Sequence, residues 1–163
     1  MNRNFINDLK RIYSLLNYWE EQTKERDYPM IWERMHATSC AQIGRMLAEK
    51  RNVDMEQAAL ACALHDIGRW VSGRQSEHAP KGEGPARQFL AEGIGTEETR
   101  EQIVQAIINH SKEEQIGTPL EEIVKDADIL DCYWHGEKIV KVHHLTRLEL
   151  LLGDLGIGKV KEG

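Results

Sequence analysis

The sequence predicts an all-α fold, a bundle of about six to seven helices in a single domain over residues 1–163. Apolar residues recur three and four positions apart along most of the chain, as they do in amphipathic helices. Alternation with a period of two, bounded by turn residues, is nearly absent, so strands have little support. With 163 residues, 40% of them hydrophobic, the chain suits one domain with a substantial core.

The N-terminal part predicts two amphipathic helices. The first covers about residues 4–24, and Pro29 marks the break before the second, over about residues 31–51. The apolar face of the first helix consists of Phe5, Leu9, Ile12, Leu16 and Trp19. The stripe of the second consists of Trp32, Met35, Ser39, Ile43 and Met46, with His36 beside it.

The next helix should be the central one, because it is apolar on nearly all sides. It begins at the N-cap Asp54, with Gln57 closing a capping box, and is expected to end at Gly68 and Gly73. The polar segment 72–84 follows as a loop, and loops of this length within a compact domain are often functional.

The C-terminal part predicts four more amphipathic segments. They cover about residues 85–92, a helix from the N-cap Thr96, a helix from Thr118 with Glu121 completing a capping box, and residues 137–152. The helix after Thr96 carries Ile103, Ile107 and His110 on one face. The last segment has a stripe of Ile139, Val142, Leu145, Leu148 and Leu152. This stripe suits docking on the bundle, or on a second copy as a homodimer, better than membrane binding.

The composition excludes several classes of protein. Lys and Arg number 21 against 27 Asp and Glu, and a net charge of −6 disfavours binding to extended nucleic acid. The sequence shows neither a signal peptide nor an apolar run of membrane-spanning length, so we expect a soluble, cytoplasmic protein. Cys40, Cys62 and Cys132 have no CxxC spacing and are expected to be reduced core thiols.

Histidines and aspartates on three predicted helices point toward the same core. His65 and Asp66 lie near the end of the central helix, where an unpaired carboxylate would be costly. His36 and Asp128 lie at the apolar faces of two other helices. A single such histidine is more often a satisfied core residue than a ligand, but the four together favour a metal site. Imidazole and carboxylate are ligands for several divalent metals, which make hydroxide available near pH 7.

The order His36, His65-Asp66, Asp128 resembles the HD superfamily of metal-dependent phosphohydrolases. Residues 64–69 (LHDIGR) resemble that family's HDIG-type motif, and residues 125–131 (KDADILD) resemble its closing aspartate motif. The similarity covers about residues 31–133 and leaves an N-terminal helix and a C-terminal helical extension outside it. The resemblance implies a helical bundle that holds a divalent ion (Mn, Fe, Mg, Co, Ni or Zn) through His36, His65, Asp66 and Asp128. Asp126 and Asp131 would then cap helices or hold the ligands.

Further residues have roles that the resemblance suggests. Some branches of the family bind a second metal, and His78, His110 and Lys112 are candidates for that metal or for substrate contact. The segment from His78 to residues 84–86 is longer than the family's usual spacing, which weighs against a second metal. Asp66 and Arg69 are the catalytic candidates: Asp66 would orient the attacking water, and the Arg69 fork suits a phosphate. His135, His143 and His144 lie beyond the similarity and are expected to be surface or packing residues, since adjacent residues face different sides of a helix.

The expected function is metal-dependent hydrolysis of phosphate mono- or diesters, with a nucleotide or another small phosphorylated metabolite as substrate. One alternative is a di-iron oxygenase of the HD fold, which needs six protein ligands. Another is a regulatory module that binds nucleotides without catalysis, for which a missing ligand would be the sign. All four HD ligands are present in this chain.

Overall fold

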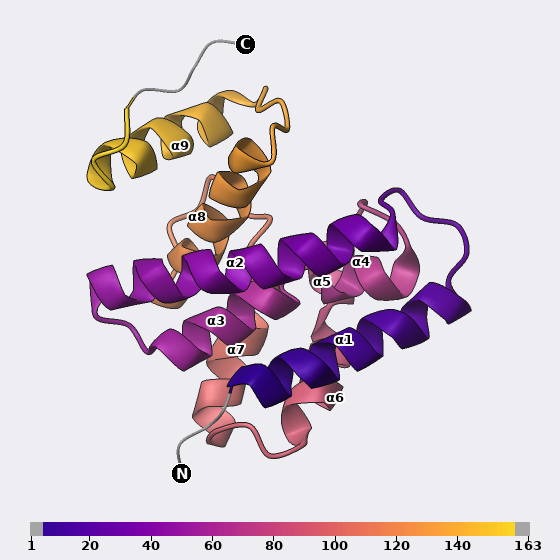
Figure 1. The fold of residues 1–163 in the computed structure, drawn as a ribbon. Helices are drawn as coiled ribbons and strands as arrows, with labels where there is room; N and C mark the ends of the chain where they lie inside the picture. Colours follow the sequence, from indigo (N-terminus) through magenta and orange to yellow (C-terminus); the bar gives the residue numbers. More distant parts are fainter. Residues whose placement is uncertain (1–4, 159–163) are drawn as a thin grey trace.

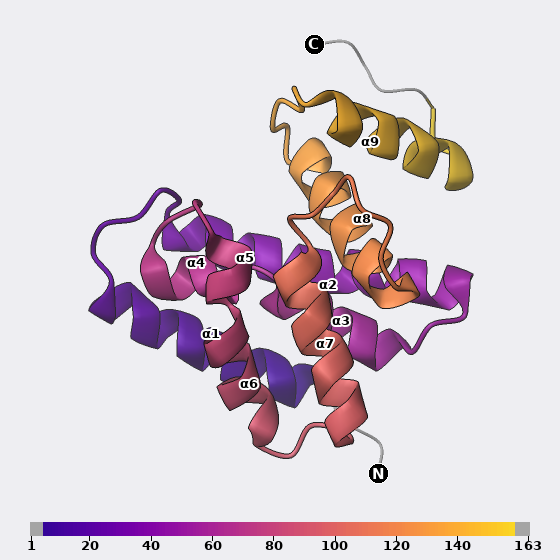
Figure 2. The same ribbon diagram turned by 180° about the vertical axis from the view of Figure 1, so that it is seen from behind.

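A computed structural model describes residues 5–158 and confirms the all-α fold (Figures 1 and 2). Within this range there are seven helices of nine residues or more, two shorter helices and no strand. Their bounds are α1 Phe5–Gln22, α2 Met30–Arg51, α3 Met55–Leu64, α4 Ile67–Ser72, α5 His78–Lys81, α6 Glu83–Ala91, α7 Glu97–Asn109, α8 Pro119–Trp134 and α9 Val142–Asp154. No helix in the described part of the chain is long and apolar enough to cross a membrane.

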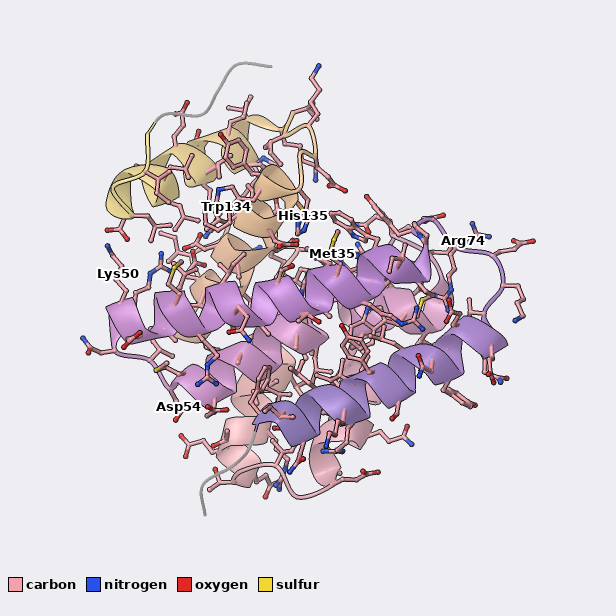
Figure 3. All side chains as sticks on the ribbon, viewed as in Figure 1. Met35, Lys50, Asp54, Arg74, Trp134 and His135 are labelled. Carbon is pink, nitrogen blue, oxygen red and sulfur yellow. The ribbon has the colours of Figure 1, made fainter. Side chains whose placement is uncertain are left out.

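The centre of the bundle is the pair α2 and α3, which pack along each other. Helix α8 packs on both of them, and α7 packs on α3 (Figure 2). Helix α9 lies against α8, on the far side of the molecule from α1 and α6 (Figure 1). Lys50, near the left end of α2 in Figure 3, donates a hydrogen bond to the carbonyl of Asp154 at the end of α9. The last helix is therefore an extension that contacts the bundle mainly through α8.

The buried face of α2 differs from the predicted stripe. Met35 and Met46 are about 40% exposed, whereas Ala37, Cys40 and Leu47 are buried. The face turned toward the core consists largely of small residues, because α3 approaches closely; a Cβ on Gly44 would lie 2.5 Å from the Cys62 sulfur. Sequence hydrophobicity favours the larger methionines and misses this close approach. His36 consequently lies on the buried face itself.

The prediction of one continuous helix through the HD dipeptide was wrong. Helix α3 ends at Leu64, and Asp66 has φ −94° and ψ 12° before α4 begins at Ile67. Helix α4 ends at Ser72 and is followed by Gly73, whose φ of 73° favours glycine. The polar segment predicted as a loop contains the one-turn helix α5 and the start of α6. At this interruption the Asp66 side chain is buried and contacts histidines of α2 and α5.

Several local predictions hold. The side chains of Asp54, Thr96 and Thr118 cap α3, α7 and α8, and Thr118 forms a capping box with Glu121. The Gln57 side chain instead reaches α7, so the box predicted at α3 is only half formed. The three cysteines are free thiols. Cys40 and Cys62 are buried as expected, whereas Cys132 is partly exposed.

Candidate metal centre

The four HD residues come together from three regions of the bundle. His36 lies in the middle of α2, His65 and Asp66 lie in the turn between α3 and α4, and Asp128 lies on α8. The side chains of His36, His65 and Asp66 are almost fully buried, and that of Asp128 is 29% exposed. The packing of α8 against both α2 and α3 brings these side chains together.

Four ligand atoms in this cluster are spaced as they would be around one cation. The His36 Nε2 atom lies 3.2 Å from the His65 Nε2 and 3.2 Å from the Asp128 Oδ1. The Asp66 Oδ2 atom lies 3.4 Å from the His36 Nε2 and 3.2 Å from the His65 Nε2. Ligands about 2.0–2.2 Å from a tetrahedral ion are roughly 3.4 Å apart. These residues therefore fit a divalent metal.

The other oxygen of Asp66 faces a second pair of histidines. Its Oδ1 atom lies 3.1 Å from the His78 Nε2 and 3.8 Å from the His110 Nε2. The two histidine Nε2 atoms are 2.8 Å apart. The sequence spacing after His78 weighed against this arrangement, but α5 folds the longer segment back so that His78 reaches Asp66. Asp66 is thus placed between two histidine pairs.

The Nδ1 atoms of all four histidines are held by acceptors. His36 Nδ1 lies 2.6 Å from the Asp131 Oδ2, and the Nδ1 atoms of His65, His78 and His110 lie 2.6–2.7 Å from backbone carbonyls. When each Nδ1–H donates to its acceptor, each Nε2 faces the centre of the cluster, where it can bind a metal ion or carry a proton. Lone pairs of facing nitrogens repel one another unless a cation or proton lies between them. The donor arrangement therefore fits metal ligation.

The charges in the cluster stabilise one another. Burial raises the pKa of Asp66, but Arg69 and His65 outweigh it and hold that pKa well below its usual value. Burial likewise opposes charge on His65, yet Asp66 and Asp128 raise its pKa well above 6.5. The Asp66 Oδ2 atom is buried and makes no hydrogen bond of standard geometry with the described residues. Without a cation, protonation of His65 would balance part of the charge of the two carboxylates.

Arg69 is committed to protein partners. Its Nε and Nη2 atoms donate to the two carboxylate oxygens of Glu33 at 2.8 and 3.0 Å, and its Nη1 donates to the Gln75 Oε1 at 2.6 Å. Its Nη2 also lies 2.5 Å from the Asp66 Oδ2, and the guanidinium stacks on the Tyr28 ring at 4.5 Å. The side chain is 6% exposed, so its contacts favour holding Asp66 in place over free contact with a phosphate.

A pocket of about 480 Å³ opens beside the cluster. Tyr28 and Trp32 line one part of it, and the Trp32 ring stacks on His36 with centroids 5.3 Å apart. Residues 137–141, between α8 and α9, line another part. Lys112 is exposed, donates to the Asn109 side chain and does not line the pocket.

Lys125 and Cys132 also line the pocket, although the sequence did not indicate them as site residues. Both lie on α8 within four residues of Asp128, so their spacing from this ligand was the available signal. His135, labelled in Figure 3, follows the end of α8, and its Nδ1 lies 3.2 Å from the Asp131 Oδ1. Asp131 thereby holds both His135 and the metal candidate His36.

Comparison with known proteins agrees with this geometry. Residues 35–132, more than half of the chain, match the HD domain family. Neither the curated proteins nor the solved structures include a match to this chain. The matched region contains both histidine pairs and both aspartates of the cluster. The chain belongs to the HD domain family, and its buried His/Asp cluster is that of a metal-dependent phosphohydrolase.

Proposed function

We propose that this protein hydrolyses phosphate mono- or diesters of a nucleotide or another small phosphorylated metabolite. The observation that carries this proposal is the position of the Asp66 carboxylate, which lies between two histidine pairs and lines a pocket. A pocket of about 480 Å³ is large enough for a small ligand. The net charge of −6 disfavours binding of a long polyanion, whereas cations in the site can neutralise the charge of a single phosphoester.

The distances within the cluster support a ligand role for six of its residues. His36, His65, Asp66 and Asp128 would hold one divalent cation, and Asp66 with His78 and His110 would hold a second. Histidine-rich sets favour Mn, Fe, Co, Ni or Zn over Mg. When bound, such cations polarise a phosphoryl oxygen and lower the pKa of a water molecule.

The remaining pocket residues bind and orient. Arg69 is a positioning residue, because its bonds to Glu33 fix the guanidinium that touches the Asp66 Oδ2. Asp66 would in turn orient the attacking water. Tyr28 and Trp32 offer an aromatic wall for an apolar or aromatic part of the substrate. Lys138 and Lys141 line the pocket and would attract the phosphate.

The test begins with metal analysis of protein purified without chelators. Phosphate release is then screened over nucleotides and small phosphoesters with Mn, Mg, Co, Ni and Zn. We expect metal-dependent release from at least one small phosphoester and its loss, together with loss of bound metal, in Asp66→Ala. Metal-dependent turnover that survives Asp66→Ala would overturn the assignment.

A second function is favoured by one observation. The cluster offers six protein ligands, His36, His65, Asp66, His78, His110 and Asp128, which is the number that a di-iron oxygenase of this fold needs. Iron-loaded protein is therefore also tested for oxygen uptake. Two irons per chain with substrate-dependent oxygen consumption, and no phosphate release, would favour the oxygenase over the hydrolase.

A further inference from the structure

A second group of ligating side chains lies outside the HD cluster, between the loop after α7 and the start of α9. The His143 Nε2 atom lies 2.8 Å from the Glu113 Oε2, and the His144 Nε2 contacts the same oxygen. The two imidazole rings are nearly perpendicular, with centroids 4.6 Å apart. One ligand atom from each of the three residues lies within 4.8 Å of the other two. These side chains therefore converge on one point.

This convergence was not expected from the sequence. Neighbouring residues on a helix point about 100° apart, which argued against a shared ligand for His143 and His144. Both residues lie in the first turn of α9, and Glu113 comes from a separate loop to meet them. A carboxylate between two imidazoles lets both rings turn toward it, so helical spacing did not exclude the cluster.

The donor set suits zinc or a similar divalent cation. Two imidazole nitrogens and one glutamate oxygen form a three-ligand set that zinc uses with a fourth position left open. The His144 Nε2 atom is buried, and its contact with the Glu113 Oε2 is not a hydrogen bond of standard geometry. The Glu113 and His144 side chains are only 18% and 20% exposed.

We propose that Glu113, His143 and His144 bind a zinc-like divalent cation, separate from the centre at Asp66. Both histidines lie beyond residues 35–132, the region that matches the HD family. Glu113 and His144 also line the pocket, and residues 137–141 immediately precede α9. The ion would fasten the start of α9 to the loop after α7 and so fix the wall that carries Lys138 and Lys141.

The experiment counts zinc in the full chain. Metal-free protein is incubated with zinc chloride, dialysed and analysed for bound metal, and its thermal unfolding is followed with and without zinc. The variants are Glu113→Gln, which keeps the side-chain size, and His144→Ala. Glu149→Gln, an exposed residue on the same helix, is the matched control.

We expect each test variant to bind one zinc fewer per chain than the wild type and to lose part of the zinc-induced rise in Tm. The control should match the wild type. Helix content by circular dichroism and Tm without zinc identify a variant that fails to fold, and Glu113→Gln is the variant designed to avoid this. Unchanged zinc content and unchanged zinc-induced stabilisation in Glu113→Gln would overturn the proposal. That result would show that Glu113, His143 and His144 only hydrogen-bond to one another.

A separate arm distinguishes this site from the proposed hydrolase centre. In Asp66→Ala, the zinc bound by the α9 site should remain, at one equivalent per chain, and adding His144→Ala should remove it. Zinc lost completely in Asp66→Ala alone would contradict a second site. Neither readout depends on turnover, so failure of the proposed function would leave this result intact.

Discussion

Asp66 presents its two carboxylate oxygens to different pairs of histidines. Both the aspartate and its neighbour His65 could be predicted from the dipeptide, and His36 and Asp128 from their spacing and faces. His78 could be named but not placed, because its position depends on the one-turn helix α5. Arg69 could be predicted as a neighbour of the site, but its pairing with Glu33 joins residues 36 positions apart. Local spacing carries no information on such a contact.

Asp131 offers a test of how the histidine rings are held. Its Oδ2 atom lies 2.6 Å from the His36 Nδ1 and fixes the ring with Nε2 toward the centre. Asp131→Asn weakens this acceptor with little change in size. We expect affinity for the metal to fall about 10- to 100-fold. Isothermal titration calorimetry of metal into metal-free protein measures this affinity. Asp154→Asn, at the exposed last residue of α9, is the control. Equal affinities for Asp131→Asn and the wild type would show that the hydrogen bond does not support ligation.

The raised pKa of His65 predicts proton release on metal binding. Without metal, His65 stays protonated above pH 6.5, because its pKa is raised by Asp66 and Asp128. A cation must displace that proton, so affinity should increase as pH rises from 6.5 toward the folded-state pKa of His65. Calorimetry at pH 7 in two buffers with different ionisation enthalpies should show protons entering the buffer. Binding enthalpies that do not depend on the buffer would contradict this protonation state.

The same pKa shifts set the stability of the metal-free chain. The His65 contribution is present below pH 6.5 and is lost as pH rises through its raised pKa. The Asp128 contribution is present above its ordinary pKa of 3.8 and is lost as pH falls through the lowered value. Together they favour the metal-free fold between about pH 4 and the raised pKa of His65.

At the scale of elements, α4 fits closely against α5 and the residue that follows it. A Cβ on Gly68 would lie 2.0 Å from the His78 carbonyl oxygen and 2.6 Å from the Gly82 nitrogen. These are backbone atoms, so Gly68→Ala would push α5 away. We expect the free energy of unfolding to fall by about 1–3 kcal/mol. The amount of metal bound near His78 should fall more than the amount bound near His36.

Gly84→Ala is the matched control, because no atom lies within 4 Å of the added Cβ. Gly84 lies in α6, where alanine should stabilise the helix by up to about 1 kcal/mol. Urea unfolding and metal counting on both variants make the comparison. A Gly68→Ala variant as stable as Gly84→Ala, with full metal content, would show that α5 accommodates the methyl group.

Element boundaries were predictable where a side chain signals them. Asp54, Thr96 and Thr118 are such signals, and each caps its helix as the sequence indicates. The end of α3 at Leu64 has no such signal, because neither glycine nor proline follows until Gly68 and the apolar pattern resumes at Ile67. The face of α2 was mispredicted for a different reason. The close approach of α3 at Gly44 determines which side of α2 is buried, and the sequence of α2 alone does not indicate that approach.

At the scale of the whole molecule, the fold class and the bundle around an HD cluster could be predicted from the sequence. The pocket could not, since its walls come from Tyr28 and Trp32 near the start of α2, from Lys125 on α8 and from residues 137–141. These segments meet only because α8 packs on α2 and α9 packs on α8. Residues that line a pocket select its substrate. The sequence motifs therefore indicated a class of reaction but did not identify the substrate.

The most direct measurement of the central claim is anomalous X-ray diffraction from crystals of the full chain grown with Mn²⁺. The account predicts one anomalous peak beside the Asp66 Oδ2, within reach of His36, His65 and Asp128, and a second beside the Asp66 Oδ1, within reach of His78 and His110. The first peak should disappear in His36→Ala crystals. Metal-loaded crystals with no peak beside Asp66 would contradict the account.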